Sequence, residues 1–167
     1  MLDAFKIKKL NHLSFNAKSF LSVYPWKNCE PASLTTLDKP LNQCKVSIVS
    51  SAGLYIKGEQ KKFDNNIKGG DYSYRIIPNL IEIKSLDDAH RSESFNHKGL
   101  KSNPETGMPI PQLKILEKEN LIGTLNDCHI SIMGSIFVTG RFIKNTVPKI
   151  VNLLLEDKVD CILLVPI

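Results

Sequence analysis

A polar segment in the middle of the chain, GGDYSYRIIP, carries side chains suited to binding a small charged molecule. Gly69 and Gly70 permit a tight turn whose N–H groups could face an anion. Asp71 is an acceptor, Ser73 offers a hydroxyl group, and Arg75 has a planar guanidinium that matches a carboxylate. This set predicts a site for an amino-acid-like zwitterion. The alternative is that Asp71 and Arg75 pair with each other and only fix the loop.

A histidine in the polar segment 87–109 is the candidate catalytic residue. A segment of that length without an evident helix or strand is more often functional than idle in a compact domain. His90 has the charged residues Asp87, Asp88, Arg91 and Glu93 close to it in sequence. A loop histidine near carboxylates can serve as a general acid or base. A solvated surface histidine fits the same pattern.

Other catalytic and metal-binding patterns are missing from the sequence. None of Cys29, Cys44, Cys128 and Cys161 forms a CxxC pair, and the histidines are equally dispersed. No metal or other cofactor is therefore predicted. His129 directly follows Cys128, but adjacent strand residues point to opposite faces, so a Cys–His catalytic couple is not predicted. There is no nucleophile elbow, Walker A sequence or GxGxxG.

The strands that must position these residues are short and apolar. Strands are predicted at 46–49, at 80–84, at CHISIMG and in the final run, VDCILLVPI. The final run is nearly continuous in apolar residues, which is typical of a strand covered on both faces in a parallel sheet. Helices are predicted from Pro111 to Gly123 and over residues 147–155, where apolar residues recur at helical spacing. The alternation predicts an α/β fold of three layers, with a largely parallel sheet flanked by helices.

In open sheets of this class, ligands bind beyond the carboxyl ends of the strands. Gly53 follows the first predicted strand, Gly134 and Ser135 follow the third, and Ile167 ends the last. We therefore predict that Gly53, Gly134 and Ser135 line a substrate site together with Asp71, Ser73 and Arg75.

The composition limits the class of protein. The chain has 167 residues, 22 Lys and Arg against 17 Asp and Glu, a net charge of +5, and no run of five basic residues, which argues against a nucleic-acid partner. No apolar run is long enough to span a membrane, and the N-terminal segment lacks a signal-peptide core, so a cytoplasmic protein is expected. Residues 1–43, with several prolines, are predicted to form an arm packed on an α/β domain at 44–167.

Several segments occur in an order that is familiar from one family. They are VSIVSSAGLYIKGEQKKFD, GGDYSYRIIP, the dipeptide Ala89–His90, PIPQLKILEKENLIGTL, HISIMGS and LLEDKVDCILLVPI. Together they resemble the glycine/sarcosine/betaine reductase selenoprotein B and D-proline reductase family over about residues 20–167. One departure is that Asn96 or Asn103 stands where the family pattern has a carboxylate in the long loop.

The resemblance implies reductive cleavage of a C–N bond in glycine, betaine, sarcosine, proline or a related amine. It also implies a cysteine or selenocysteine nucleophile, and often a partner subunit with a pyruvoyl or other carbonyl group. In the family pattern the nucleophile follows directly after the segment that matches LLVPI. The chain is therefore expected either to stop at a selenocysteine UGA codon or to be a genuinely shortened form.

Two functional hypotheses follow. The first is a reductase subunit, incomplete at its C-terminus, that works as a homo-oligomer or with a partner reductase subunit. The second is a non-catalytic module for amino-acid-like ligand binding or assembly.

Overall fold

The computed structural model describes residues 14–23, 33, 35–93 and 95–167 of the chain. The chain divides into two compact units, Met1–Thr35 and Thr36–Ile167. In the first unit, helix α1 spans Phe15–Val23. Residues 1–13 and 24–32 of the predicted arm lie outside the described residues, so the packing of that arm on the domain stays a prediction.

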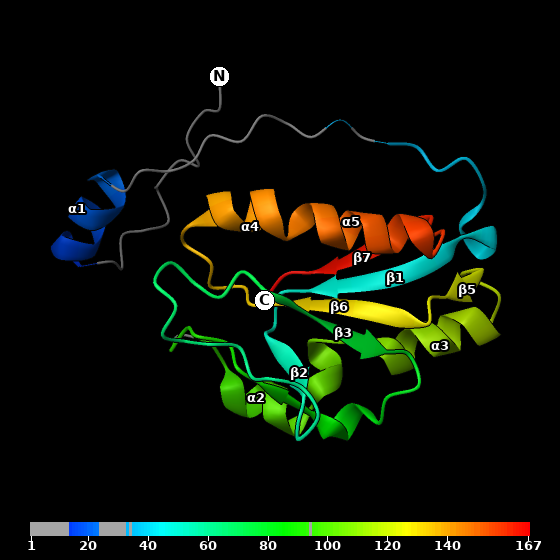
Figure 1. The fold of residues 1–167 in the computed structure, drawn as a ribbon, viewed down its shortest axis with the longest axis horizontal. Helices are drawn as coiled ribbons and strands as arrows, with labels where there is room; N and C mark the ends of the chain where they lie inside the picture. The colour runs from blue at the N-terminus through cyan, green and yellow to red at the C-terminus, as the bar shows by residue number, and fades with distance from the viewer. Residues whose placement is uncertain (1–13, 24–32, 34, 94) are drawn as a thin grey trace. The chain divides into compact units, whose positions relative to one another are not determined.

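The second unit is built on a mixed, mostly parallel sheet (Figure 1). Strand β1 (Lys45–Ser50) pairs in parallel with β7 (Cys161–Val165) on one side and with β5 (Thr124–Leu125) and β6 (Cys128–Ile132) on the other. Strand β3 (Tyr74–Pro78) continues the sheet antiparallel to β6. A separate antiparallel pair joins β2 (Leu54–Ile56) to β4 (Leu86–Asp88).

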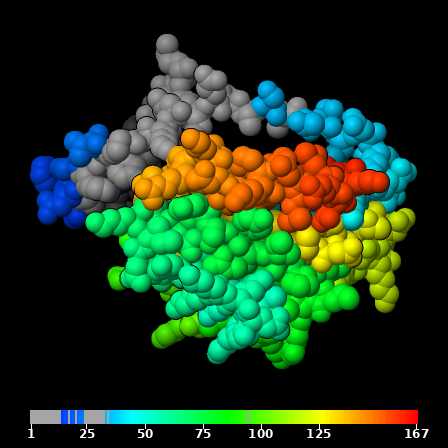
Figure 2. Space-filling model, in the orientation of Figure 1, coloured from blue at the N-terminus to red at the C-terminus, as the bar shows by residue number. Residues whose placement is uncertain are grey.

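Helices flank this sheet on both faces, which confirms the predicted α/β class (Figure 1). Helices α4 (Thr139–Asn145) and α5 (Val147–Glu156) form a band along the surface of the unit, coloured orange in Figure 2. Helix α5 packs through Ile150 and Leu154 against Ile130 of β6. On the other face, α2 (His97–Ser102) and α3 (Ile110–Lys118) contribute to a larger core that includes Val46 and Ile48 of β1. In the described part of the chain, no helix is both long and apolar enough to cross a membrane.

Two sequence predictions about local structure are wrong. The strand predicted at 80–84 is absent, because β3 ends at Pro78 and the chain turns into a short 3₁₀ helix, η3 (Ile83–Ser85). Leu80 in that turn is 89% exposed, so the apolar pattern there does not mark a buried strand. The helix predicted to reach Gly123 ends at Lys118, because Asn120 adopts a left-handed conformation with φ of 57°.

The last strand lies at the edge of the sheet, and this differs from the expectation of a strand covered on both faces. Within the described chain, Ile162, Leu163 and Leu164 are 41%, 38% and 67% exposed. The start of the strand is nevertheless tied firmly to β1. The Asp160 carboxylate accepts from the backbone N–H of Lys45 at 2.7 Å, and the Asp160 N–H donates back to the Lys45 carbonyl at 2.9 Å.

Short 3₁₀ helices complete the unit: η2 (Leu41–Gln43) and η4 (Pro104–Thr106). The second lies in the segment 87–109, which therefore contains α2 and η4 in place of a long loop. Asn96 and Asn103, one of which was predicted to replace a carboxylate of the family pattern, cap these two helices. The Asn96 side chain accepts from Gly99 N–H, and the Asn103 side chain accepts from Glu105 N–H.

Candidate functional site

The carboxyl ends of the parallel strands meet, and the end of the chain is fixed among them. The backbone N–H of Ile167 donates to the Ser51 hydroxyl at 2.9 Å, just after β1. The Ser51 N–H donates to the Val165 carbonyl at 3.1 Å. A Cβ built on Gly134, which follows β6, would lie 2.7 Å from the Ser51 carbonyl oxygen. The segments after β1, β6 and β7 therefore lie side by side, as the parallel topology requires.

His90 packs against the residues that follow the carboxyl ends of β1 and β6. The imidazole is only 7% exposed, so the alternative of a solvated surface histidine does not apply. A Cβ on Gly134 would come within 2.9 Å of His90 Nε2, and a Cβ on Gly53 would come within 2.9 Å of the His90 backbone nitrogen. Gly53 also has φ of 66°, which a residue with a side chain rarely adopts. Because Gly53 and Gly134 have no side chains, His90 can pack closely against the strand ends.

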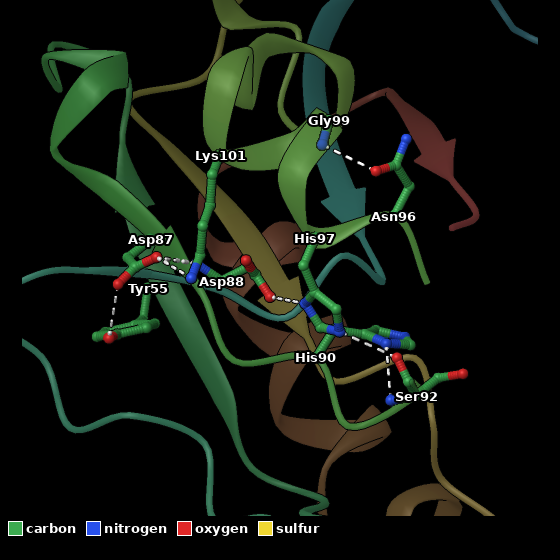
Figure 3. A network of polar contacts seen from close by, with 9 residues as sticks. All are labelled: Tyr55, Asp87, Asp88, His90, Ser92, Asn96, His97, Gly99 and Lys101. Atoms are coloured by element: carbon green, nitrogen blue, oxygen red, sulfur yellow. Dashed lines mark hydrogen bonds and ion pairs between the residues drawn. The ribbon is translucent and has the colours of Figure 1, made fainter. Parts of the chain in front are cut away.

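The hydrogen bonds of His90 determine which ring nitrogen carries its proton. The backbone N–H of Ser92 donates to Nδ1 at 3.2 Å, so the neutral ring must carry its hydrogen on Nε2 (Figure 3). Nε2 is buried and has no hydrogen-bond partner among the described residues. Burial, and then the neighbouring His97, lower the pKa of His90, and Asp88 opposes them only in part. His90 therefore presents an electrically neutral N–H donor.

The predicted residues Asp71, Ser73 and Arg75 form a second, connected group. Asp71 accepts from the backbone N–H and the hydroxyl of Ser73, at 2.8 and 2.6 Å. Arg75 Nη1 donates to the Ser73 hydroxyl at 2.8 Å, and its Nε donates to the Lys61 carbonyl at 2.7 Å. The guanidinium also stacks on the ring of Phe63, 4.1 Å from its centroid. Ser73 thus joins Asp71 to Arg75, which makes no direct ion pair with that carboxylate.

The hydrogen bonds and charges around Asp71 keep its carboxylate ionised. Burial raises the pKa of Asp71, but hydrogen bonds from Ser73 and from the Asp64 backbone, with the charge of Arg75, lower it below its usual value overall. The carboxylate is therefore ionised at neutral pH. Arg75 Nη2 makes no hydrogen bond with any described residue, which leaves one edge of the guanidinium available to a ligand.

The group lines an open cleft of about 540 Å³. Its walls come from two stretches of chain and are made by Gln60, Lys61, Asp64, Ile67, Asp71, Tyr72, Ser73 and Arg75.

The cleft and the strand ends are connected through their loops. The Gly69 carbonyl accepts from the backbone N–H groups of Phe137 and Val138, in the loop after β6. A Cβ on Gly70 would lie 2.7 Å from the carbonyl oxygen of Ser135. Arg91, next to His90, donates to the Ile67 carbonyl at 3.2 Å. The structure therefore brings His90, Gly53 and Gly134 together and puts Ser135 between them and the Asp71 group.

Sequence reasoning missed three residues of this region: Ser51, Asp88 as a partner of His97, and His97 itself. Ser51 ties down Ile167 only because parallel strands bring residues 51 and 167 together. His97 Nδ1 lies 2.5 Å from Asp88 Oδ1 (Figure 3). The spacing of these residues along the chain contains no signal for that contact.

None of the described thiols has the properties of an activated nucleophile. Cys44 is fully buried, and Cys161 is partly buried beside the larger core. Burial and the hydrogen-bonded Asp157 raise the pKa of Cys128 to about 11. Cys29 lies outside the described residues. In the described part of the chain, no three His, Cys, Asp or Glu side chains are grouped to hold a metal ion.

Comparison with known families gives a match over almost the whole chain. Residues 4–166 match the family described as glycine/sarcosine/betaine reductase selenoprotein B. The chain belongs to this family. The resemblance identified from the ordered sequence segments is thereby confirmed.

A curated relative is D-proline reductase subunit gamma of Acetoanaerobium sticklandii. It is 28% identical over 134 residues, which cover 80% of this chain and 53% of the relative. The chain therefore spans about half the length of the curated relative that it matches. No solved structure shows a significant match.

Proposed function

We propose that this chain is a subunit of a reductase that cleaves the C–N bond of glycine, betaine, sarcosine, proline or a related amine. The observation that carries the proposal is the tethering of Ile167 to Ser51, beside Gly134 and His90. A thiol or selenol that enters this region from the end of β7 meets a buried N–H donor. Membership of the selenoprotein B family supports the same reaction class.

The chemistry begins with a thiolate or selenolate that attacks the carbon bearing the amine. A bond forms between that carbon and sulfur or selenium, the C–N bond breaks, and the amine leaves with the bonding electron pair and takes up a proton. His90 lies where the nucleophile would enter, and its Nε2–H can hydrogen-bond to an anion without giving up the proton.

The substrates of this class carry a carboxylate as well as an amine. Arg75 is the residue that we assign to the carboxylate, because its guanidinium lines the cleft and has an unused edge. Asp71, held ionised by Ser73 and Asp64, is the matching acceptor for a cationic amine. Gly53, Gly134 and Ser135 would shape the wall between this cleft and His90.

Among the described residues β7 pairs with β1 alone, and its other edge is the expected contact with a partner, either a second copy of this chain or another reductase subunit. Ile162 and Leu164 are exposed, and an uncovered apolar edge strand favours the addition of another strand. The matched relative is itself named as a subunit. We place the protein in the cytoplasm.

The second candidate function is a binding or assembly module without turnover. It is favoured by the described thiols, since Cys44 is buried and Cys128 has its pKa raised to about 11. In this version the cleft binds the amine and the nucleophile comes from another polypeptide.

Calorimetry with glycine, sarcosine, betaine and D-proline tests both versions. We expect binding of at least one of them, and about tenfold or greater weakening by Arg75→Lys, because a lysine cannot replace the planar fork. Arg141→Lys, an exposed change on α4, is the matched control and should leave affinity unchanged. Absence of binding by all four compounds, or equal affinity in Arg75→Lys, would refute the substrate assignment. An assay of amine release distinguishes the reductase from the binding module. The chain is copurified with its partner subunits and supplied with a dithiol as reductant, and release of the amine supports the reductase.

A further inference from the structure

Three aromatic rings form a closed cluster over the strand ends, and the proposed function uses only one of them. The ring centroids of His90 and Phe95 are 4.5 Å apart. His97 meets Phe95 edge-on, with centroids 5.0 Å apart, and lies 6.4 Å from His90. The two histidines therefore share one environment, and His97 is one of the groups that lower the pKa of His90.

His97 is hydrogen-bonded through both ring nitrogens. Its Nε2 lies 3.0 Å from the Ser92 carbonyl oxygen, which can only accept, so Nε2 carries a hydrogen. Its Nδ1 lies 2.5 Å from Asp88 Oδ1, a contact that has one hydrogen between the two atoms. Asp88 is buried, with a side chain only 2% exposed, and its other oxygen has no described partner.

The neighbouring carboxylate, Asp87, is directed elsewhere. Consecutive residues of β4 point to opposite sides. Asp87 accepts from the Tyr55 hydroxyl at 3.3 Å and pairs loosely with Lys101 at 3.9 Å (Figure 3). Asp88 is therefore the carboxylate dedicated to His97.

Ser92 joins the two histidines. Its carbonyl accepts from His97 Nε2–H, while its N–H donates to His90 Nδ1 (Figure 3). Any movement that removed the bond to His97 would release the residue whose N–H determines the tautomer of His90. The chain of contacts therefore runs from Asp88 through His97 and Ser92 to His90.

We propose that Asp88 and His97 are positioning residues that hold His90 in its neutral tautomer, with the hydrogen on Nε2 at the strand ends. The role deepens the proposed function, on which it rests: His90 becomes a fixed N–H donor for an anion such as a thiolate, selenolate or carboxylate oxygen. No proton is transferred in this role. A neutral imidazole that acts as a hydrogen-bond donor is an established way to stabilise developing negative charge.

The charges around His90 suit this role. Asp88 on β4 and His97 on α2 are the titratable groups whose charges act on it. Burial and His97 disfavour a second proton on His90, so the ring stays neutral while the proton of the adjacent pair lies between Asp88 and His97. A cationic His90 would lose its bond from the Ser92 N–H, because Nδ1 would then carry a hydrogen.

The test is the tautomeric state of His90 in the intact chain, read from long-range ¹H–¹⁵N correlations of the histidine rings. We expect the Nε2–H form at pH 7, and a second protonation only at a lower pH than an exposed histidine requires, because burial and His97 lower the pKa of His90. The change His97→Phe keeps a ring in the cluster and removes both hydrogen bonds. It should shift the tautomer ratio of His90 about tenfold toward Nδ1–H, the effect of losing one buried hydrogen bond.

The controls separate this role from general disruption. Asp87→Asn, on the opposite side of the same strand, should leave the His90 signals unchanged. The ring of His129, buried in the sheet, reports whether each variant remains folded. The double change Asp88→Asn/His97→Phe avoids an unpaired buried carboxylate and should show the same tautomer shift if the single variant fails to fold. His97→Gln, whose amide can still donate to Ser92, should restore the wild-type ratio in part.

Two results would overturn the proposal. One is an Nδ1–H or doubly protonated His90 in the unchanged protein at pH 7. The other is an unaltered tautomer ratio in a folded variant that lacks the His97 imidazole. Substrate calorimetry measures neither of these quantities, so a failure of the proposed substrates and a failure of the hydrogen-bond chain to hold the His90 tautomer would be distinguished from each other.

Discussion

The substitution Gly134→Ala tests the geometry of the strand ends directly. The added Cβ would lie 2.7 Å from the Ser51 carbonyl oxygen and 2.9 Å from His90 Nε2. Ordinary van der Waals contacts with a Cβ are 3.4–4 Å. Moving the Ser51 backbone away would break the hydrogen bond from its N–H to the Val165 carbonyl of β7. The variant must therefore separate β1 from the loop after β6 or push His90 out of its place.

Overpacking of this kind typically costs about 1–3 kcal/mol. For a chain of this length, each kcal/mol lowers the melting temperature by about 2–4 °C. Gly134→Ala should therefore lower the free energy of unfolding by about 1–3 kcal/mol and the melting temperature by several degrees. Urea denaturation and thermal melts, both followed by circular dichroism, measure the two quantities.

The chain offers a matched control in Gly140, in helix α4, where a Cβ would meet nothing within 4 Å. Gly140→Ala should stabilise the protein by about 0.5–1 kcal/mol, since alanine loses less backbone entropy in a helix. The two alanine substitutions are thus expected to have opposite signs. If Gly134→Ala is as stable as the unchanged protein, the close packing of His90 and Ser51 around this glycine is incorrect.

Three further predictions concern the core and the buried titratable groups. Leu154→Ala should lower the free energy of unfolding by about 2–5 kcal/mol, because this side chain is only 5% exposed. Leu155 is 67% exposed, so Leu155→Ala should change it by less than about 1 kcal/mol. Urea denaturation measures both variants. Burial, followed by the charge of Lys114, lowers the pKa of His129 to about 4, so between pH 6.5 and 4 the unfolded chain binds a proton that the folded chain does not. The His129 ring should contribute a loss of about 3 kcal/mol of stability as the pH falls from 6.5 to 4, and His129→Asn should remove that contribution. Cys128 should react with iodoacetamide at pH 8 at least about a hundredfold more slowly than free cysteine, since its pKa is about 11, and a fast reaction in the folded protein would contradict its burial beside Asp157.

Apolar patterns among residues that are close in sequence predicted much of the fold correctly. The apolar runs predicted β1, β6 and β7, and the helical spacing of apolar residues predicted α5. These patterns work because each reports the periodicity with which one element meets the core. The error at 80–84 has the same origin, since an apolar pattern cannot distinguish a buried strand from the exposed turn that contains Leu80.

The helix cap at Thr146 shows a different limit. Its position before α5 is typical of an N-cap, yet its hydroxyl bonds to the Tyr72 carbonyl instead of to the helix. A tertiary contact between residues far apart in sequence has replaced the local one. Helix α4, which is largely exposed, left no strong periodic signal and was not predicted.

The sequence alone determined the family, the α/β class and the candidates His90, Asp71 and Arg75, because ordered segments and residue types are properties of the chain itself. Only the tertiary structure showed that Ser51 hydrogen-bonds to Ile167 after β7. It also showed that His90 packs against Gly53 and Gly134. The contact between Asp88 and His97, next to His90, likewise depends on the folded structure. Parallel strands bring together residues more than a hundred positions apart, and no local pattern encodes which side chains meet there.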